Sequence, residues 1–191
     1  VTLASKITDD RAVAIVTLDT QAHVDAADYG NARHIVADRA GNLVLAYVDV
    51  VRAAPAIVLA HSSTSGVSWI VESEHIGPSA SRPALAYDEV NDKLHVFYHA
   101  QGSDERSDAR YRRYTIQRTS DGRILGFKSE GEVVLHARST SRGTLLWTPD
   151  GGPNGALVAA WTAFDGKQSR DIRITMRALS NDSADFDAAH W

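Results

Sequence analysis

The 191-residue chain contains no cysteine, so it can form neither a disulfide bond nor a thiolate metal site. This absence leaves the compartment open, because some secreted proteins also lack disulfides. Basic residues are not in excess either: 20 lysines and arginines face 24 aspartates and glutamates, a formal net charge of −4. Binding to nucleic acid depends on a positively charged surface, and we therefore expect no nucleic-acid partner.

Long apolar runs are missing as well. No stretch approaches the roughly 20 apolar residues that a membrane-spanning helix needs, so we expect no membrane span. No segment shows the 3.6-residue periodicity of an amphipathic helix. The chain begins at Val1, without a methionine or a leader-like segment, and we expect a processed product or a piece of a longer chain.

Short apolar runs separated by turn residues make up most of the sequence. Within residues 32–69, three such runs are rich in Val, Ile, Leu and Tyr, are bounded by Gly, Asn and Ser, and end at Trp69. Runs of this kind predict antiparallel strands. Further strands are expected on the same grounds at 11–18, 69–75, 93–99, 110–118, 132–136, 144–147, 156–163 and 171–179. Residues 1–10 are polar, and no partner strand is expected before the run at 11–18.

One pattern occurs three times, at residues 33–47, 82–98 and 142–161. Each copy has an arginine, a short apolar strand, a turn rich in Asp, Asn or Gly, and a second apolar strand that ends in an aromatic residue. A repeat of roughly 40–50 residues with four strands per unit is typical of a β-propeller blade. The sequence therefore predicts an all-β fold, a β-propeller of four-stranded antiparallel blades, with about three blades in this chain. An ordinary β-sandwich is the alternative.

The repeat divides the chain into units. The expected units are an N-terminal segment with one strand at 1–31, blades at about 32–80, 81–140 and 141–179, and a polar tail at 180–191. The third blade lacks an obvious outermost strand, which the run at 11–18 is placed to supply. Three blades do not close a ring, because propellers typically have four to eight. We therefore expect either a fragment of a longer propeller or a homo-oligomer that completes the ring.

Residues 62–69 resemble the Asp-box, S-x-D-x-G-x-[ST]-W, of the BNR repeat in sialidases and their relatives. Ser62, Gly66, Ser68 and Trp69 match this motif, and Thr64 stands where the aspartate belongs. In that family the box lies on the turn after a blade's third strand, and the predicted strand order places it there in this chain too.

A second likeness involves the arginine of each repeat. Residues 32–35 and 81–84 are similar to the Arg-Ile-Pro motif with which sialidases open their first blade. Together the two likenesses cover roughly residues 32–179. They imply a BNR-type, sialidase-like propeller that is secreted or displayed on the cell surface.

The resemblance also implies an anion-binding role for the repeated arginines. Sialidases hold the substrate carboxylate with three arginines, because the guanidinium fork matches a carboxylate and stays charged. The resemblance gives Arg33 this role. The internal repeat extends it to Arg82 and Arg142, which we expect beside Arg33 at one mouth of the central axis. The alternative for each arginine is an ion pair with a nearby aspartate or a cap on backbone carbonyls.

The match to the catalytic residues of sialidases is less complete than the match to their arginines. The family's acid/base aspartate follows the second strand of the first unit, where this chain has Asp49; a solvated strand-end acid is the alternative. A sialidase also needs a tyrosine nucleophile and a glutamate, and no tyrosine after Tyr114 has a matching context. We expect the chain to bind a carbohydrate or another anionic small ligand at the propeller mouth. The alternatives are part of a sialidase-like glycoside hydrolase and a purely structural, assembly-forming propeller.

For two further groups of polar residues, we expect structural positions rather than a ligand site. Residues 110–114, with three arginines and two tyrosines, are predicted to form a half-exposed, solvated outer strand; contact with an anionic ligand is the alternative. His95 and His99 lie about 13 Å apart along a strand, too far for one metal ion, and we expect them at a surface or an interface. No metal site and no cofactor is expected.

Overall fold

The computed structural model describes residues 2–8, 11–19, 22, 26–27, 32–51, 53–101, 107–137, 140–164 and 170–179. This part of the chain is all-β: strands make up three antiparallel sheets and one hairpin, and the only helical element in it is the 3-10 turn η1 (Pro149–Gly151). No helix among the described residues is long and apolar enough to cross a membrane.

Each sheet is an up-and-down meander in which strands adjacent in sequence are adjacent in space. The first sheet contains β3 (Ile35–Ala37), β4 (Leu43–Val51), β5 (Ala54–Ser62) and β6 (Ile70–Ile76). The second contains β7 (Ala80–Asp88), β8 (Lys93–Gln101), β9 (Ser107–Arg118) and β10 (Ile124–His136). The third contains β11 (Thr140–Thr148), β12 (Ala156–Phe164) and β13 (Arg170–Ala178), and the hairpin contains β1 (Thr2–Thr8) and β2 (Arg11–Thr17).

Most predicted strands are confirmed, with two corrections. The run at 11–18 does have a partner before it, because β1 pairs with β2 along its whole length, from Thr2 opposite Thr17 to Thr8 opposite Arg11. Backbone hydrogen bonds need no apolar side chains, so a polar segment forms this strand. β10 also begins earlier than predicted, at Ile124. The polar tail at 180–191 lies outside the described residues.

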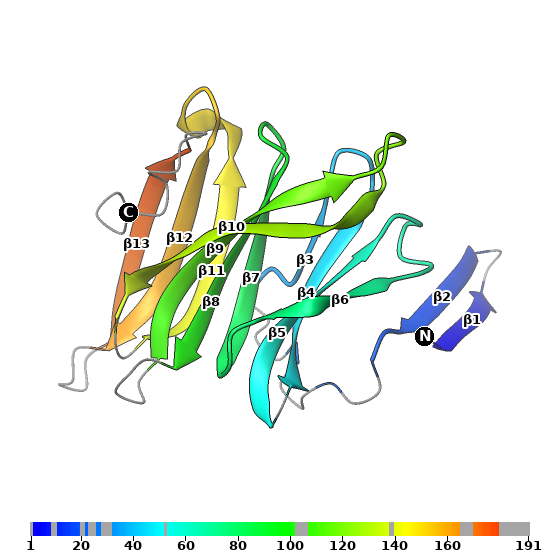
Figure 1. The fold of residues 1–191 in the computed structure, drawn as a ribbon, viewed down its shortest axis with the longest axis horizontal. Helices are drawn as coiled ribbons and strands as arrows, with labels where there is room; N and C mark the ends of the chain where they lie inside the picture. The colour runs from blue at the N-terminus through cyan, green and yellow to red at the C-terminus, as the bar shows by residue number, and fades with distance from the viewer. Residues whose placement is uncertain are drawn as a thin grey trace.

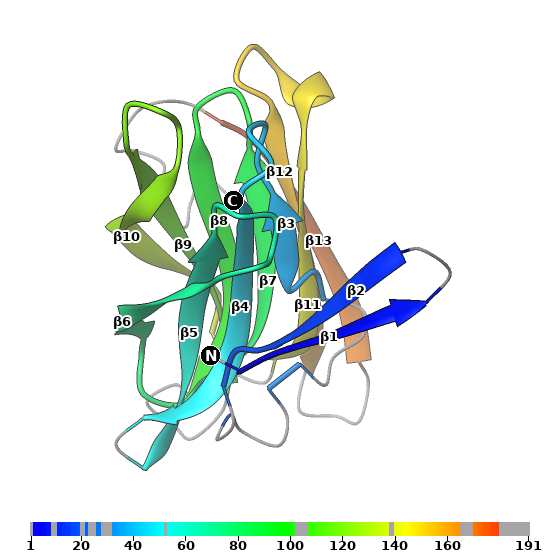
Figure 2. The ribbon, with the colours of Figure 1, turned by 90° about the vertical axis from the view of Figure 1, so that its right-hand side faces the viewer.

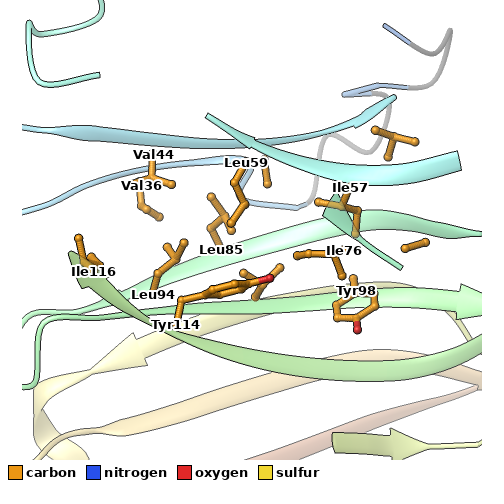
Figure 3. Packing of buried hydrophobic residues seen from close by; sticks show 14 of the residues in the cluster. Val36, Val44, Ile57, Leu59, Ile76, Leu85, Leu94, Tyr98, Tyr114 and Ile116 are labelled. Carbon is orange, nitrogen blue, oxygen red and sulfur yellow. The ribbon is translucent and has the colours of Figure 1, made fainter. Parts of the chain in front are cut away.

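The three sheets stack face to face, with the second sheet between the other two (Figure 1). We call the face of a sheet that packs on the next sheet along the chain face A, and the opposite face, which packs on the previous sheet, face B. Face A of the first sheet meets face B of the second in one apolar cluster (Figure 3) that includes Val44, Ala46, Ile57, Leu59, Leu85, Leu94, Val96 and Tyr98. Face A of the second sheet meets face B of the third in another, with Ala84, Phe97, Tyr111, Leu145, Leu157, Ala159 and Trp161.

Strand β8 shows why the middle sheet is buried on both sides. Side chains alternate between the faces of a strand, so Leu94, Val96 and Tyr98 face the first sheet. Phe97 lies on the opposite face of the strand, where it packs with Trp161 of the third sheet at 6.2 Å between ring centroids. A strand enclosed in this way has a nearly continuous run of buried residues, as β8 does.

The first strands of the three sheets lie side by side at the centre of the molecule, with β7 between β3 and β11 (Figures 1 and 2). The segment before β3 crosses this centre: the backbone N–H of Leu85 donates to the carbonyl of Arg33 over 2.7 Å. Ala32 packs against the cluster between the second and third sheets. The described sheets do not form a closed ring, so the propeller prediction stays a prediction.

The turns between the first and second strands of the first two sheets are built alike. Asp38 accepts a hydrogen bond from the backbone N–H of Asn42 at 2.8 Å, and Asp88 accepts one from that of Asn91 at 3.0 Å. Each asparagine donates its side-chain amide back to the other oxygen of the same carboxylate, at 2.6 Å and 2.7 Å. The internal repeat seen in the sequence is therefore also a repeat of local structure.

Candidate functional site

Arg82 and Arg142 occupy equivalent structural positions. Each lies near the start of the first strand of its sheet, at a register shift against the second strand. Each also has a positive φ, 56° for Arg82 and 48° for Arg142. A left-handed residue other than glycine costs roughly 1–2 kcal/mol, so the second and third sheets repeat the same strained bulge around an arginine.

Arg33 lies just before β3 and differs in its surroundings. Its backbone is anchored to β7 by the hydrogen bond from Leu85, and its side chain is exposed. Within the part of the chain that the structure describes, no hydrogen bond or ion pair engages its guanidinium. Among the described residues, the charge of Arg33 is therefore unpaired.

A hollow of about 330 Å³ lies beside Arg33, and we call it the Arg33 hollow. It is lined by Arg33, Ile35, Val36, Ala37, Tyr87, Glu89 and Trp147. Ala37, Tyr87 and Trp147 are equivalent positions of β3, β7 and β11, because each precedes the residue whose side chain caps the following turn. The hollow is therefore formed jointly by the first strands of all three sheets.

Two polar groups in the hollow already have partners. The hydroxyl of Tyr87 donates to Asp92 Oδ1 over 3.0 Å. Burial and this hydrogen bond raise the pKa of Tyr87, so its hydroxyl stays protonated. Glu89 Oε2 accepts a longer hydrogen bond, of 3.4 Å, from Arg39 Nε, and both of these side chains are exposed. Among the described residues, the hollow thus combines one unpaired cation, one carboxylate and two aromatic rings.

The other two predicted arginines lie elsewhere. Arg82 is close to the buried His99, whose pKa is lowered to about 3 by burial and by the positive charge of Arg82. Arg142 lines a separate hollow of about 320 Å³ on the third sheet, with Thr144, Ala160, Trp161, Thr162 and Ile172. Neither residue lines the Arg33 hollow. A role for Arg82 and Arg142 in binding the ligand stays a prediction.

Asp49 is on β4, opposite Ala56 and on the same face as Tyr47. Its Oδ1 accepts a hydrogen bond from the backbone N–H of Val50 at 2.6 Å. Burial, Asp19 and then Asp49 raise the pKa of Tyr47 to about 12. Asp49 does not line the Arg33 hollow, and its catalytic role stays a prediction.

The Asp-box-like segment lies between β5 and β6, the third and fourth strands of the first sheet, as the resemblance implied. Thr64 Oγ1 accepts a hydrogen bond from the backbone N–H of Ser68 at 2.8 Å, and Ser62 Oγ accepts one from that of Gly66 at 2.9 Å. Trp69 Nε1 donates to the carbonyl of Gly66 at 3.0 Å. Gly66 has φ +84°, a backbone conformation that favours glycine. These contacts close the loop, and Thr64 supplies an acceptor where the motif has its aspartate.

The expectation of a solvated outer strand at 110–114 is wrong. β10 pairs with β9 along nearly its whole length, so β9 is an inner strand. Glu132 of β10 binds Arg110 Nη1 at 2.8 Å and Arg112 Nη2 at 2.7 Å. Glu130 forms ion pairs with Arg113 and Lys93. The arginines of this strand therefore neutralise acids within the sheet.

His95 and His99 are fully buried between the second and third sheets, so they belong to an interface and not to the surface. His95 Nδ1 is 2.7 Å from the hydroxyl of Tyr111. Among the described residues, no group of three or more His, Asp or Glu side chains is arranged to hold a metal ion.

Sequence reasoning did not select Tyr87, Glu89 or Trp147, although all three line the Arg33 hollow. The signal that marks two of them is their place in the repeat, since Tyr87 and Trp147 end equivalent first strands. Comparison with known proteins adds no relative: no family model, curated protein or solved structure matches the chain.

Proposed function

We propose that the three sheets are blades of a BNR-type, sialidase-like β-propeller and that the chain binds an acidic carbohydrate in the Arg33 hollow. The observation that carries the proposal is the joint lining of this hollow by the first strands of all three sheets, beside the guanidinium of Arg33, which no described residue pairs. Such a binding role suits a secreted or cell-surface protein.

The blade interpretation is supported by repetition at three levels. All three sheets are meanders, and face A of one sheet packs on face B of the next sheet twice in succession. Turn caps recur at Asp38 and Asp88, and the left-handed bulge recurs at Arg82 and Arg142. A β-sandwich has two packed sheets, whereas the middle sheet here has a packed partner on each face.

The chemistry of the hollow suits a small acidic sugar. A guanidinium forms charge-assisted, often bidentate hydrogen bonds with a carboxylate. The rings of Tyr87 and Trp147 offer flat apolar surface, and Glu89 is an acceptor for sugar hydroxyls. The volume of about 330 Å³ is at the lower end of the range for small-ligand sites.

Binding is better supported than hydrolysis. Glycoside hydrolysis requires two acidic groups, or a nucleophile activated by one. Of the described residues that line the hollow, Glu89 is the one with a carboxylate. The raised pKa of Tyr87 disfavours the phenolate that a nucleophile needs.

A glycan array with acidic and neutral sugars tests the proposal. We expect binding to acidic sugars, and we expect Arg33→Ala to weaken it by about tenfold or more, since a hydrogen bond to a charged group contributes roughly 1.5–3 kcal/mol. Arg123→Ala is the matched control, because this exposed arginine pairs with Asp121 in the β9–β10 turn. Absence of acidic-sugar binding by folded protein, or binding unchanged in Arg33→Ala, would contradict the proposal.

A fluorogenic sialoside separates binding from hydrolysis. We expect no turnover by the folded chain. Turnover that is lost in Asp49→Asn would instead favour the hydrolase alternative.

A further inference from the structure

Face A of the third sheet is apolar and uncovered by the described residues. Ile172, Ile174 and Met176 of β13 are 76%, 69% and 66% exposed. The strand pairing places Ala160 beside Ile174, and Val158 between Met176 and Leu146. Isolated exposed apolar residues are ordinary, but a contiguous apolar patch marks an interaction site.

The chain itself shows what covers such a face. Face A of the first sheet is covered by face B of the second, and face A of the second by face B of the third. Within the described part of the chain, this packing leaves two sheet faces without a neighbouring sheet: face A of the third sheet and face B of the first. The contact of face A with face B therefore occurs twice within the chain, and each end of the stack keeps one such face without its counterpart.

Face B of the first sheet is only partly covered. Tyr47 and Val58 pack with Leu18, Ala22 and Ala26 of the preceding segment. The next row of the sheet runs from Ile35 through Leu45 and Ala60 to Val71. Ile35 is 47% and Val71 42% exposed at the two ends of this row. The two ends of this row are therefore open apolar surface, while Ala60 between them is buried.

Charged side chains lie near both faces. Arg142 lies in the hollow on face A of the third sheet. Asp19 and Asp49 lie beside Tyr47 on face B of the first sheet. Arg33 lies beside Ile35 at the edge of the same face. A contact of face A with face B can pair Arg142 with the two acids, which a contact of face A with itself does not offer.

We infer that copies of this chain associate head to tail, with face A of the third sheet in one copy packed on face B of the first sheet in the next. This inference goes beyond the proposed binding function and does not depend on it. The contact is heterologous, so it builds a closed ring if the rotation between copies closes and an open chain of copies if it does not. Each new interface repeats the sheet-on-sheet packing found within one chain.

Sedimentation velocity of the full 191-residue chain, from low to high micromolar concentration, tests the inference. We expect species heavier than the 20.7 kDa monomer, in a proportion that rises with concentration. Ile174→Lys should remove them. Leu125→Lys, at a leucine 62% exposed on β10, is the matched control and should leave them in place.

A mixing experiment tests the head-to-tail geometry. Val71→Lys blocks face B and Ile174→Lys blocks face A, so each variant alone should sediment as a monomer. An equal mixture should form dimers, because one intact face A and one intact face B remain. Both residues are exposed, so near-ultraviolet circular dichroism should match that of the wild type.

Three results would overturn the inference. A wild-type chain that stays at 20.7 kDa at every concentration excludes self-association. Association that survives Ile174→Lys places the contact elsewhere. Association that is lost in Ile174→Lys but kept in Val71→Lys shows a contact of face A with itself.

Discussion

Arg118 of β9 joins two sheets through Asp38, with 2.6 Å between its Nη1 and Asp38 Oδ2. The same guanidinium donates from Nε and Nη2 to the two oxygens of Asp92, at 2.7 Å and 2.6 Å. Asp38 belongs to the first sheet's turn and Asp92 to the second's, so one side chain ties the turn ends of both. The hydrogen bond from Arg118 is the main cause that lowers the pKa of Asp92.

Arg118→Ala should therefore lower the free energy of unfolding by about 3 kcal/mol, because it leaves the buried Asp38 carboxylate without its cation. Arg118→Lys should recover only part of this loss, since an ammonium group lacks the planar geometry with which the guanidinium binds Asp38 and both oxygens of Asp92. Urea unfolding measures both, with Arg123→Ala as the exposed control. An unfolding midpoint for Arg118→Ala equal to that of the control would contradict the account.

Glu130 should make stability depend on acid pH. Burial by itself would raise its pKa, but hydrogen bonds from Lys93, Thr115 and Arg113 outweigh burial and lower the pKa from 4.5 to about 2. Stability from a lowered carboxyl pKa is present above 4.5 and is lost as pH falls from 4.5 towards 2. The shift corresponds to roughly 3 kcal/mol.

Urea unfolding of the wild type and of Glu130→Gln at several pH values measures this effect. The wild type should be the more stable at pH 7, and the difference between the two proteins should shrink below pH 4.5. A difference that stays constant down to pH 2 would show that the Glu130 charge is not what stabilises the fold.

His99 should also make stability depend on pH, over a range that begins at a higher pH than that of Glu130. Burial and Arg82 lower its pKa from 6.5 to about 3, so it is neutral in the folded chain. Its contribution is complete above pH 6.5 and is lost as pH falls towards 3, by about 1.4 kcal/mol per pH unit. His99→Gln should reduce the slope of stability against pH between 6.5 and 4.5, even if it also lowers stability overall. An unchanged slope would mean that His99 takes up its proton in the folded state.

Thr64 should tolerate the residue that the Asp-box motif prescribes. Thr64→Asp keeps an acceptor for the backbone N–H of Ser68 and should leave the melting temperature nearly unchanged. Thr64→Val has nearly the same shape but no acceptor, and should cost about 1 kcal/mol. If thermal unfolding gives the two variants the same melting temperature, the Thr64 hydroxyl is not what closes this loop.

The strands and the repeat could be predicted from the sequence because both are local signals. Alternating apolar runs locate β8, β9, β12 and β13, and turn residues separate them. β1 could not be predicted, because its backbone pairing does not require apolar side chains. The early part of β10 was missed because Gly126 and Gly131 interrupt its apolar pattern.

The candidate site was predictable only in part. Arg33 was selected from the resemblance to sialidases and does line a hollow. Tyr87 and Trp147 join it through packing between sheets, which no local pattern reports. The burial of His95 and His99 likewise follows from stacking the third sheet on the second. Contacts between distant segments therefore decide which residues meet.

Calorimetric titration with an acidic sugar and with its methyl ester measures whether Arg33 contacts the carboxylate of the proposed ligand. We expect wild-type protein to bind the acid at least about tenfold more tightly than the ester, and Arg33→Ala to bind the two equally. Equal affinity of the wild type for acid and ester, or a preference for the acid that survives Arg33→Ala, would contradict this contact.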